Sequence, residues 1–293
     1  FNGEKYLREQ LDSVLAQRNV DLILLVRDDG STDGTRGLLA EYAKRDDRIA
    51  VHEGNNLGVV ASFLDTMRLA AATSSDYFAL CDQDDVWLPD KLSRAVELLS
   101  PNTAVPRMYC TTVQYVDRDL KDLGLSYALR RPSFGNAVVE NIATGCTVVI
   151  NRPFLQLVNS APPPGALVHD WWLYLVATAF GQVAFDERSW ILYRQHGGNA
   201  IGGSASFLKS LAARLRRLPL RSTGVFRCSD QAAEFHACFG TRCQVSDRAM
   251  LEEMLAARNS TFRRIRFAFS GRVRRTRWID DAILRVLIVV GLY

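Results

Sequence analysis

Between Glu4 and about Lys121 the chain alternates short apolar segments with amphipathic segments of helical period, and this alternation restricts its fold more than any other feature. The run Leu-Ile-Leu-Leu-Val at 22–26 is continuously apolar and bounded by polar residues, which is typical of a strand buried on both faces. Strands that alternate with helices predict β-α-β units around a mainly parallel sheet. We therefore expect an α/β domain.

The same periodicities locate the other elements. After Pro101 the apolar runs become short and β-like, and beyond residue 204 the chain is helical in pattern and rich in arginine. We expect helices near 6–15, 35–43, 59–72, 89–99 and 171–180, and strands near 49–52, 77–81, 108–113, 146–150 and 190–193.

Composition bounds the class of protein. With 293 residues and 48% hydrophobic residues the chain is able to bury a large core. Its six cysteines are scattered without CxxC pairing, which predicts free thiols in a reducing compartment, the cytoplasm. No secretory signal is visible, and no run reaches the roughly 18 apolar residues of a membrane span, so we expect a soluble or peripheral protein.

An acidic turn directly follows the predicted strand at 22–26. It reads Arg-Asp-Asp-Gly-Ser-Thr-Asp-Gly-Thr over residues 27–35. Open α/β sheets bind ligands where their strands end. The carboxylates of Asp28 and Asp29 are suited to accept hydrogen bonds from a base edge or ribose hydroxyls, and the alternative is a turn that only caps the next helix.

A second acidic cluster, Asp82-Gln-Asp-Asp-Val-Trp, follows the strand predicted at 77–81. Three carboxylates within four residues repel one another, and a divalent cation offsets that repulsion. Hard oxygen ligands suit Mg²⁺ or Mn²⁺ that holds a diphosphate. A solvated loop is the alternative interpretation.

Two later motifs are weaker when taken alone. In Val-His-Asp-Trp-Trp, Asp170 precedes Trp171 and Trp172, whose indoles are suited to stack on sugar rings and to raise the pKa of the carboxylate toward that of a general base. The alternative is that both indoles are core residues, because paired tryptophans more often belong to a core. In Tyr-Arg-Gln-His-Gly, His196 is a candidate metal ligand and Arg194 a candidate phosphate ligand.

Two other acid-dependent or phosphate-binding chemistries are excluded. A haloacid-dehalogenase phosphatase needs an aspartate at the first position of Asp-x-Asp-Gly-Thr, where this chain has Arg27. A P-loop enzyme needs a GxxxxGK[ST] run, and the sequence contains none. Nucleic acid is not expected as a partner, because no aromatic-rich binding motif accompanies the arginines.

In their order along residues 1–205, these motifs resemble those of the family 2 glycosyltransferases, and within that family the bacterial rhamnosyltransferases that build surface polysaccharides. The segments that carry the resemblance are Phe1-Asn-Gly-Glu-Lys-Tyr-Leu, Asp28-Asp-Gly-Ser-Thr-Asp-Gly-Thr, Asn56-Leu-Gly, Asp82-Gln-Asp-Asp-Val-Trp, Gly145-Cys-Thr, His169-Asp-Trp-Trp and Tyr193-Arg-Gln-His-Gly.

The resemblance implies a GT-A fold, an inverting mechanism, and a dTDP- or UDP-linked donor held with Mg²⁺ or Mn²⁺. It makes Asp170 the catalytic base and assigns metal contacts to Asp84 and His196. The substrate contacts that motif and resemblance together suggest are Asp28, Asp29, Asp82, Gly145, Trp171, Trp172 and Arg194. The family's usual first strand precedes the segment that begins at Phe1, so this strand is expected to be missing from the chain.

The function expected from this resemblance is transfer of L-rhamnose from dTDP-L-rhamnose to a saccharide or lipid-diphosphate-linked acceptor. One alternative is transfer of another UDP- or dTDP-hexose. An alternative of a different class is an inactive nucleotide-sugar-binding or scaffold protein, against which the acids Asp82, Asp84 and Asp170 argue.

The C-terminal region, residues 206–293, is predicted to be a helical addition to a catalytic domain at 1–205. Seven arginines between Arg263 and Arg277 precede an apolar segment whose stripe is suited to an anionic membrane surface. The alternative is a helix that packs back on the catalytic domain. The residues predicted for the stripe are Ile279, Ile283, Leu284, Val286, Leu287 and Val290.

Overall fold

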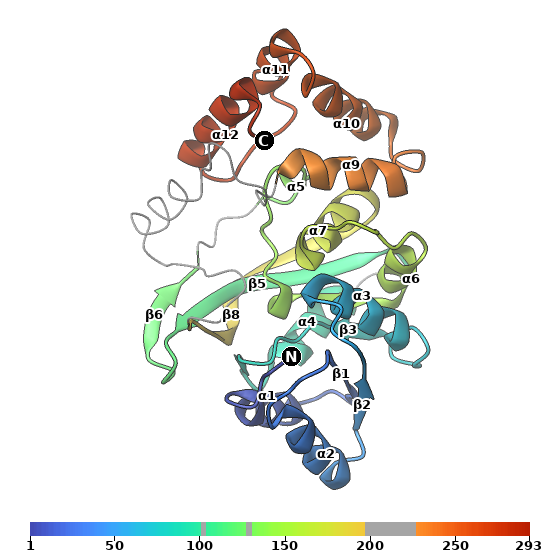
Figure 1. Cartoon of the computed structure of the whole chain (residues 1–293), viewed down its shortest axis with the longest axis vertical. Helices are drawn as coiled ribbons and strands as arrows, with labels where there is room; N and C mark the ends of the chain where they lie inside the picture. Colours follow the sequence, from blue (N-terminus) through green and yellow to red (C-terminus); the bar gives the residue numbers. More distant parts are fainter. Residues whose placement is uncertain (101–103, 127–130, 197–226) are drawn as a thin grey trace.

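The computed structural model describes residues 1–100, 104–126, 131–196 and 227–293 (Figure 1). A small α/β layer forms one end of the molecule, a larger sheet crosses the middle, and helices of the C-terminal region form the other end. The predicted α/β class is therefore confirmed.

The first layer holds a pair of parallel strands, in which Val26 lies opposite Val51. Apolar side chains of the two neighbouring helices, among them Leu11 and Leu39, are buried in a cluster beside these strands. The elements of this layer are α1 (Leu7–Leu15), β1 (Leu24–Asp28), α2 (Thr35–Arg45), β2 (Ile49–Glu53) and α3 (Val59–Ala70). The sequence predicted each of them to within a few residues.

The larger sheet has the strand order β3-β7-β5-β8-β4, with β6 paired to β5. Its strands are β3 (Tyr77–Ala79), β4 (Val86–Trp87), β5 (Arg107–Val116), β6 (Asp122–Leu125), β7 (Val149–Asn151) and β8 (Gln182–Arg194).

The expectation of a mainly parallel sheet is wrong for the described strands. Besides β1 with β2, only β5 with β8 is parallel, and the other four pairs are antiparallel. Periodicity identifies a strand but not its direction, which depends on the connection. The short turn after Val116 reverses the chain into β6, for example, as in any hairpin.

Helices cover this sheet and join it to the C-terminal region. Asn151 ends β7 and caps α6, because its side chain accepts a hydrogen bond from Phe154 N at 3.2 Å, and Pro153 suits the first turn. The remaining elements are α4 (Lys91–Leu99), α5 (Phe134–Ala137), η2 (Gly145–Thr147), α6 (Arg152–Asn159), α7 (His169–Phe180), α9 (Cys228–Phe239), α10 (Val245–Ala257), α11 (Thr261–Ala268) and α12 (Trp278–Val290).

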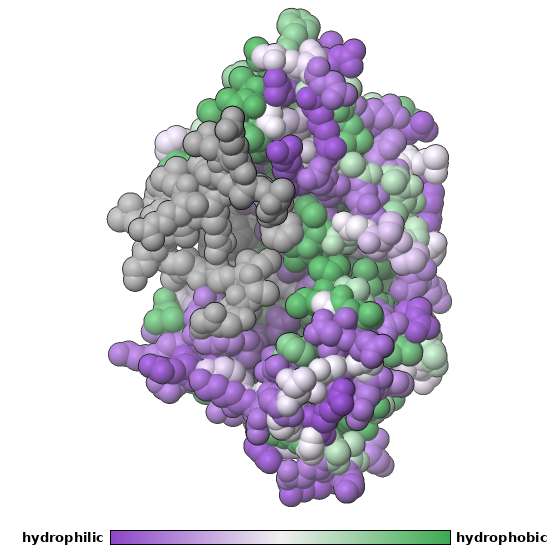
Figure 2. All heavy atoms as spheres, viewed as in Figure 1, coloured by the Kyte–Doolittle hydropathy of each residue, from purple (hydrophilic) through white to green (hydrophobic). Residues whose placement is uncertain are grey.

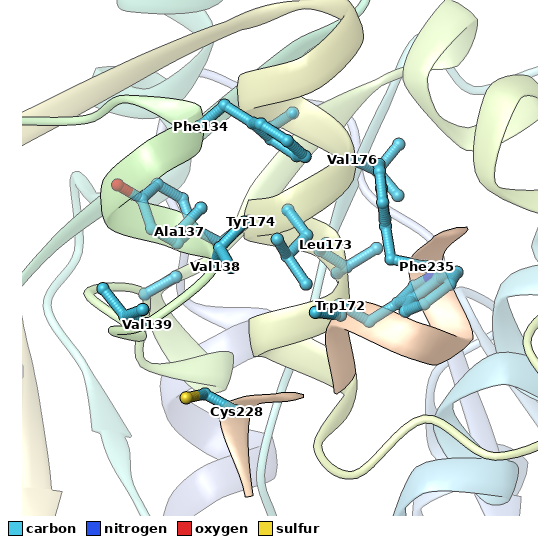
Figure 3. Close-up of a cluster of buried hydrophobic side chains, with 14 of the residues drawn as sticks. Phe134, Ala137, Val138, Val139, Trp172, Leu173, Tyr174, Val176, Cys228 and Phe235 are labelled. Atoms are coloured by element: carbon cyan, nitrogen blue, oxygen red, sulfur yellow. The ribbon is translucent and has the colours of Figure 1, made fainter. Parts of the chain in front are cut away.

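The C-terminal helices share one core with the catalytic part of the chain. Trp172 of α7 is fully buried against Phe235 and Phe239 of α9 (Figure 3). Glu140 belongs to the same junction, since its carboxylate accepts hydrogen bonds of 2.7 Å from Thr276 N and Oγ1. The helical character of the C-terminal region is confirmed for residues 227–293, while the predicted boundary at 205 lies outside the described residues.

Candidate active site

The acidic turn after β1 is held together by Asp28. This residue is buried, and its Oδ2 accepts hydrogen bonds from Gly30 N at 3.2 Å, Ser31 N at 2.9 Å and Arg36 Nε at 3.0 Å. Burial opposes ionisation, but the hydrogen bonds from Ser31 and Arg36 outweigh it and lower the pKa of Asp28. Gly30 adopts a φ of 82°, which favours glycine. Asp28 is thus an anion whose Oδ1 has no partner among the described residues.

Asp29 has a different local role. Its Oδ1 accepts a hydrogen bond from Leu57 N at 2.9 Å and pairs with Arg27, and its Oδ2 accepts one from Gly58 N at 3.0 Å. Burial again opposes ionisation, yet these donors lower the pKa of Asp29. Asp29 therefore fastens the β1 turn to the loop before α3. Nucleoside binding by both acids stays a prediction, and Asp28 has the more available oxygen.

The second acidic cluster lies between β3 and β4. Asp85 is buried; its Oδ1 accepts a hydrogen bond from Arg194 N at 3.1 Å, and its Oδ2 has no partner among the described residues. Burial, followed by the charge of Asp84, raises the pKa of Asp85 to about 7. Burial and the charges of Asp85 and Asp84 also raise the pKa of Asp82 well above its usual range. The crowding inferred from the sequence is therefore present in the structure.

A pocket of about 300 Å³ opens beside this cluster. The end of β8 brings His196 Nε2 to 2.7 Å from Asp84 Oδ2, and the His196 ring lies 5.0 Å from that of Tyr6. Residues 112 positions apart thus form one wall, as the predicted metal contacts of Asp84 and His196 require. The residues that line the pocket are Asn2, Gly3, Lys5, Tyr6, Gln83, Asp84 and His196.

Arg194 does not offer its guanidinium to this pocket. The side chain is almost fully buried; Nε donates to the carbonyl of Asp84 at 2.9 Å, and the terminal nitrogens donate to the carbonyl of Arg118 and to Glu9. The guanidinium also lies 4.5 Å from the Tyr6 ring centroid. The expected phosphate contact is therefore corrected to a positioning role, because these protein acceptors satisfy the charge and hold the acidic loop.

The proposed base, Asp170, lies in the first turn of α7. Its Oδ1 accepts hydrogen bonds from Asn141 Nδ2 at 2.8 Å and Trp171 N at 2.6 Å, and its Oδ2 accepts one from Gly145 N at 2.9 Å. Burial outweighs these donors and raises the pKa of Asp170 to about 6. The charge of Asp170 in turn contributes to the raised pKa of Asp82, so the two carboxylates share one electrostatic site.

Close packing explains why residue 145 is a glycine. A Cβ at this position would lie 2.8 Å from His169 Nε2 and 3.5 Å from Asp170 Oδ2. His169 stacks on Phe63 with a centroid distance of 4.0 Å, and burial lowers its pKa to about 4. Gly145 thus reaches the site through its backbone N–H, and His169 is neutral at pH 7.

The two tryptophans of this motif, Trp171 and Trp172, lie in different environments. Trp171 is partly buried and donates from Nε1 to the carbonyl of Ala137 at 2.6 Å. Trp172 is 0% exposed, so its expected sugar contact is wrong. Adjacent helical positions point about 100° apart, so one indole of the pair reaches the core between α7 and α9. A sugar contact of Trp171 stays a prediction.

Sequence reasoning missed several neighbours of the acids. Asn141 orients Asp170, and Lys91 lies fully buried with its ammonium 3.5 Å from the Trp87 ring centroid. Burial lowers the pKa of Lys91 to about 8. In the sequence, only the closeness of Asn141 to Gly145 of the Gly-Cys-Thr motif indicates that Asn141 belongs to the site. Lys91 carries no such signal, because a lysine in the first turn of a helix is normally solvated.

The donor atoms fit a hard divalent cation only in part. One ligand atom each from Asp82, Asp85 and Cys146 lies within 4.8 Å of the others. Burial and the charges of both acids raise the pKa of the Cys146 thiol, and a protonated sulfur is a poor ligand for Mg²⁺ or Mn²⁺. The carboxylates of Asp82 and Asp84, together with the unpartnered Oδ2 of Asp85, do suit these ions.

Comparison with known proteins identifies relatives of this chain. A sequence model of glycosyl transferase family 2 matches residues 1–156. The dTDP-rhamnosyl transferase RfbG of Shigella flexneri is 30% identical over 231 residues, which are 75% of this chain and 77% of that protein. An uncharacterised protein of Mycobacterium tuberculosis is 32% identical over 204 residues, 67% of this chain and 57% of its own length.

Solved structures agree on the fold. S. aureus TarS 1–349 in complex with UDP-GlcNAc matches with a TM-score of 0.57 and 12% identity, over 100% of this chain and 87% of that one. The same protein in complex with UDP matches with a TM-score of 0.55. These likenesses confirm the expected GT-A fold.

Proposed function

Because the chain belongs to glycosyl transferase family 2 and is a hexosyltransferase, we propose that it transfers L-rhamnose, with inversion, from dTDP-L-rhamnose to a saccharide acceptor. The observation that carries this proposal is the pairing of a buried carboxylate, Asp170, with the acidic pocket of Asp84 and His196. The similarity to RfbG over 75% of the chain supports rhamnose as the sugar.

In this proposal Asp170 is the general base. One of its oxygens takes the proton of an acceptor hydroxyl, the hydroxyl oxygen bonds to the anomeric carbon, and the bond from that carbon to the diphosphate breaks. The hydrogen bonds from Asn141, Trp171 and Gly145 orient the carboxylate. Oδ1 already accepts two of them, whereas Oδ2 accepts one and keeps a lone pair for the proton. A pKa of about 6 leaves it largely ionised at pH 7 while it remains basic enough to accept a proton.

The donor would lie between the two acidic segments. Asp28, with its unpartnered Oδ1, would accept hydrogen bonds from the nucleoside. Lys5 lines the pocket with Asp84 and His196 and replaces Arg194 as the cation available to the diphosphate.

A divalent cation completes the proposed donor site. Asp82 and Asp84 would hold Mg²⁺ or Mn²⁺ with His196 beside them, and when bound the ion would neutralise the charge of the departing diphosphate. Arg194 does not contact the donor in this proposal but supports the acidic loop, since its Nε donates to the Asp84 carbonyl and its backbone N–H donates to Asp85. It thereby sets the orientation of the acidic loop before any ligand arrives.

A donor screen tests the function. Purified protein with Mn²⁺ is offered dTDP-rhamnose, UDP-glucose, UDP-galactose and UDP-GlcNAc, and sugar release is measured beside an Asp170→Asn control. Fastest turnover of dTDP-rhamnose is expected, and faster turnover of a UDP-sugar would reassign the donor. Binding of a donor without sugar release from any of the four would favour a nucleotide-sugar-binding protein instead.

The proposal puts the reaction in the cytoplasm, at the inner face of the cell membrane, where a lipid-diphosphate-linked acceptor would be presented. Within the described residues, no helix has both the length and the apolar character needed to cross a membrane.

A further inference from the structure

The last two helices expose apolar side chains along one face each. On α12, Trp278, Val286 and Val290 are 80%, 62% and 54% exposed, at spacings of eight and four residues. On α11, Phe262 and Ile265 are 76% and 45% exposed, and Phe269, the residue that follows the end of this helix, is 69% exposed, seven positions after Phe262. Spacings of four, seven and eight place residues on one side of a helix. We call these six residues the apolar ridge.

The apolar ridge differs from the stripe predicted from sequence. Leu284 and Ile288 are buried in the core, as is Asp280 on the same side of α12. Of the predicted stripe residues, Val286 and Val290 belong instead to the exposed side, together with Trp278. One side of α12 therefore packs on the protein and the other faces outward, and contact of the exposed side with a membrane stays a prediction.

The surroundings of the apolar ridge are strongly cationic. Residues 261–293 contain eight arginines and two aspartates, a net charge of +6, whereas the whole chain carries +4. Asp280 is buried, and Asp281 pairs with Arg285 at 2.8 Å. Glu253 of α10 pairs with Arg272 at 3.3 Å and with Arg266 at 3.6 Å, so it offsets part of the positive charge and leaves a cationic excess. Arg263 and Arg266 are exposed on α11 beside the ridge residues.

Figure 2 shows apolar and hydrophilic residues side by side at the end of the molecule that α11 and α12 form. This end lies far from the α1–α2 layer along the longest axis of the molecule. Large exposed apolar side chains cost solvation free energy in water, and a rim of arginines does not remove that cost. A partner that is apolar inside and anionic at its surface satisfies both features.

We propose that the apolar ridge and its arginines form a docking face for an anionic phospholipid bilayer. Trp278, Phe262 and Phe269 would enter the interfacial region, and the arginines would pair with lipid phosphates. A second copy of this chain fits less well, because two faces of net charge +6 repel each other. This proposal does not depend on the identity of the donor sugar.

The test is co-sedimentation of the full chain with two kinds of vesicle. One is pure phosphatidylcholine, which is neutral, and the other is phosphatidylcholine with about 30% phosphatidylglycerol, which gives the bilayer the negative surface charge that the proposal requires. The wild type should pellet with the anionic vesicles at least about tenfold more tightly than with the neutral ones. Binding should fall when salt is raised to about 1 M, where the Debye length is about 3 Å.

Two variant pairs separate the contributions. Trp278→Ser with Phe269→Ser removes exposed aromatic surface, and Ile23→Ser, a 58% exposed residue near the start of β1, is its matched control. Arg263→Gln with Arg266→Gln removes charge, and Arg45→Gln on α2 is its control. Each ridge or arginine pair should weaken anionic-vesicle binding about tenfold or more, and the controls should not.

Other outcomes overturn the proposal. Equal binding to neutral vesicles, no binding, or equal effects of the control variants would reject the docking face. Dimerisation that the Trp278 and Phe269 substitutions abolish, in the absence of vesicles, would assign the ridge to a second copy. Circular dichroism and donor hydrolysis without vesicles should be unchanged in these variants, so loss of membrane binding is distinguishable from failure of the proposed transferase.

Discussion

The two acidic segments begin alike and end in opposite electrostatic states. Each follows a strand and each places adjacent aspartates at the site, yet the pKa values of Asp28 and Asp29 are lowered while those of Asp82 and Asp85 are raised. Burial raises the pKa in all four. What differs is the supply of donors. Asp28 accepts N–H groups of its own turn and Asp29 accepts those of the loop before α3, whereas Asp85 accepts one backbone N–H, from Arg194.

This contrast suggests a division of labour. A carboxylate saturated by backbone N–H groups, such as Asp29, stabilises a loop. An under-partnered one, such as Asp85, retains acceptor capacity for a cation or a proton. Asp170 combines the two, since three donors orient it and burial still raises its pKa to about 6.

The largest effect is expected for Asp170→Asn. Because the amide keeps the size but loses the basic oxygen, transfer should fall by about 10²–10⁴-fold, the usual contribution of a general base. Donor affinity, measured by calorimetry, should change little. Turnover close to wild type would instead assign the base to another acid.

A pair of substitutions tests the contrast between the acidic segments directly. Asp29→Asn removes an acceptor of Leu57 N or Gly58 N and should lower the free energy of unfolding by about 1–3 kcal/mol. Asp85→Asn retains an acceptor for Arg194 N and removes a costly buried charge, so it should cost less than about 1 kcal/mol.

For Asp85→Asn, the change in the free energy of unfolding depends on pH. Its pKa is raised to about 7, so its ionised form costs stability as pH rises from the unfolded pKa near 4 through 7, and the asparagine variant avoids that cost. Urea denaturation at pH 6 and pH 8 provides the measurement. A larger loss for Asp85→Asn than for Asp29→Asn would contradict the division of labour.

Removal of the cation should have an intermediate effect. If Asp82 and Asp84 hold Mg²⁺ or Mn²⁺ with the diphosphate, EDTA should weaken donor binding by about tenfold or more, since the acids would then repel the phosphates. Titration of the donor with and without EDTA measures this. Unchanged affinity would remove the metal from the proposal.

The smallest effect is the response to pH near neutrality. A base with a pKa of about 6 is half protonated at pH 6, so kcat/KM should be about half its plateau value there and fall about tenfold per pH unit below. The Asn141→Ala variant, which removes one donor to the carboxylate, should shift this midpoint upward. An unshifted midpoint would mean that another group controls the profile.

The sequence predicted the positions of helices and strands better than the direction of the strands. Helices and strands follow from periodicity, and the acids were located because they lie at or just beyond strand ends: Asp28 ends β1, and Asp82 comes three residues after β3. Whether two strands pair in parallel or antiparallel was not predictable, because a run of apolar residues has the same pattern in either orientation. Trp172 was misassigned for a related reason: the motif contains two adjacent tryptophans, and the local sequence does not determine which of them packs against α9.

The sequence by itself determined the family and the α/β class, and it named Asp84 and His196, which line the pocket, because motifs record chemistry and local propensity. Only the tertiary structure decided what each side chain contacts. Arg194 changed from a phosphate ligand to a support of the acidic loop because its partners, Glu9 and Asp84, lie 185 and 110 residues away. Likewise, which side of α12 is buried depends on the core that α9 and α10 build beneath it, and long-range packing of this kind leaves no pattern in the local sequence.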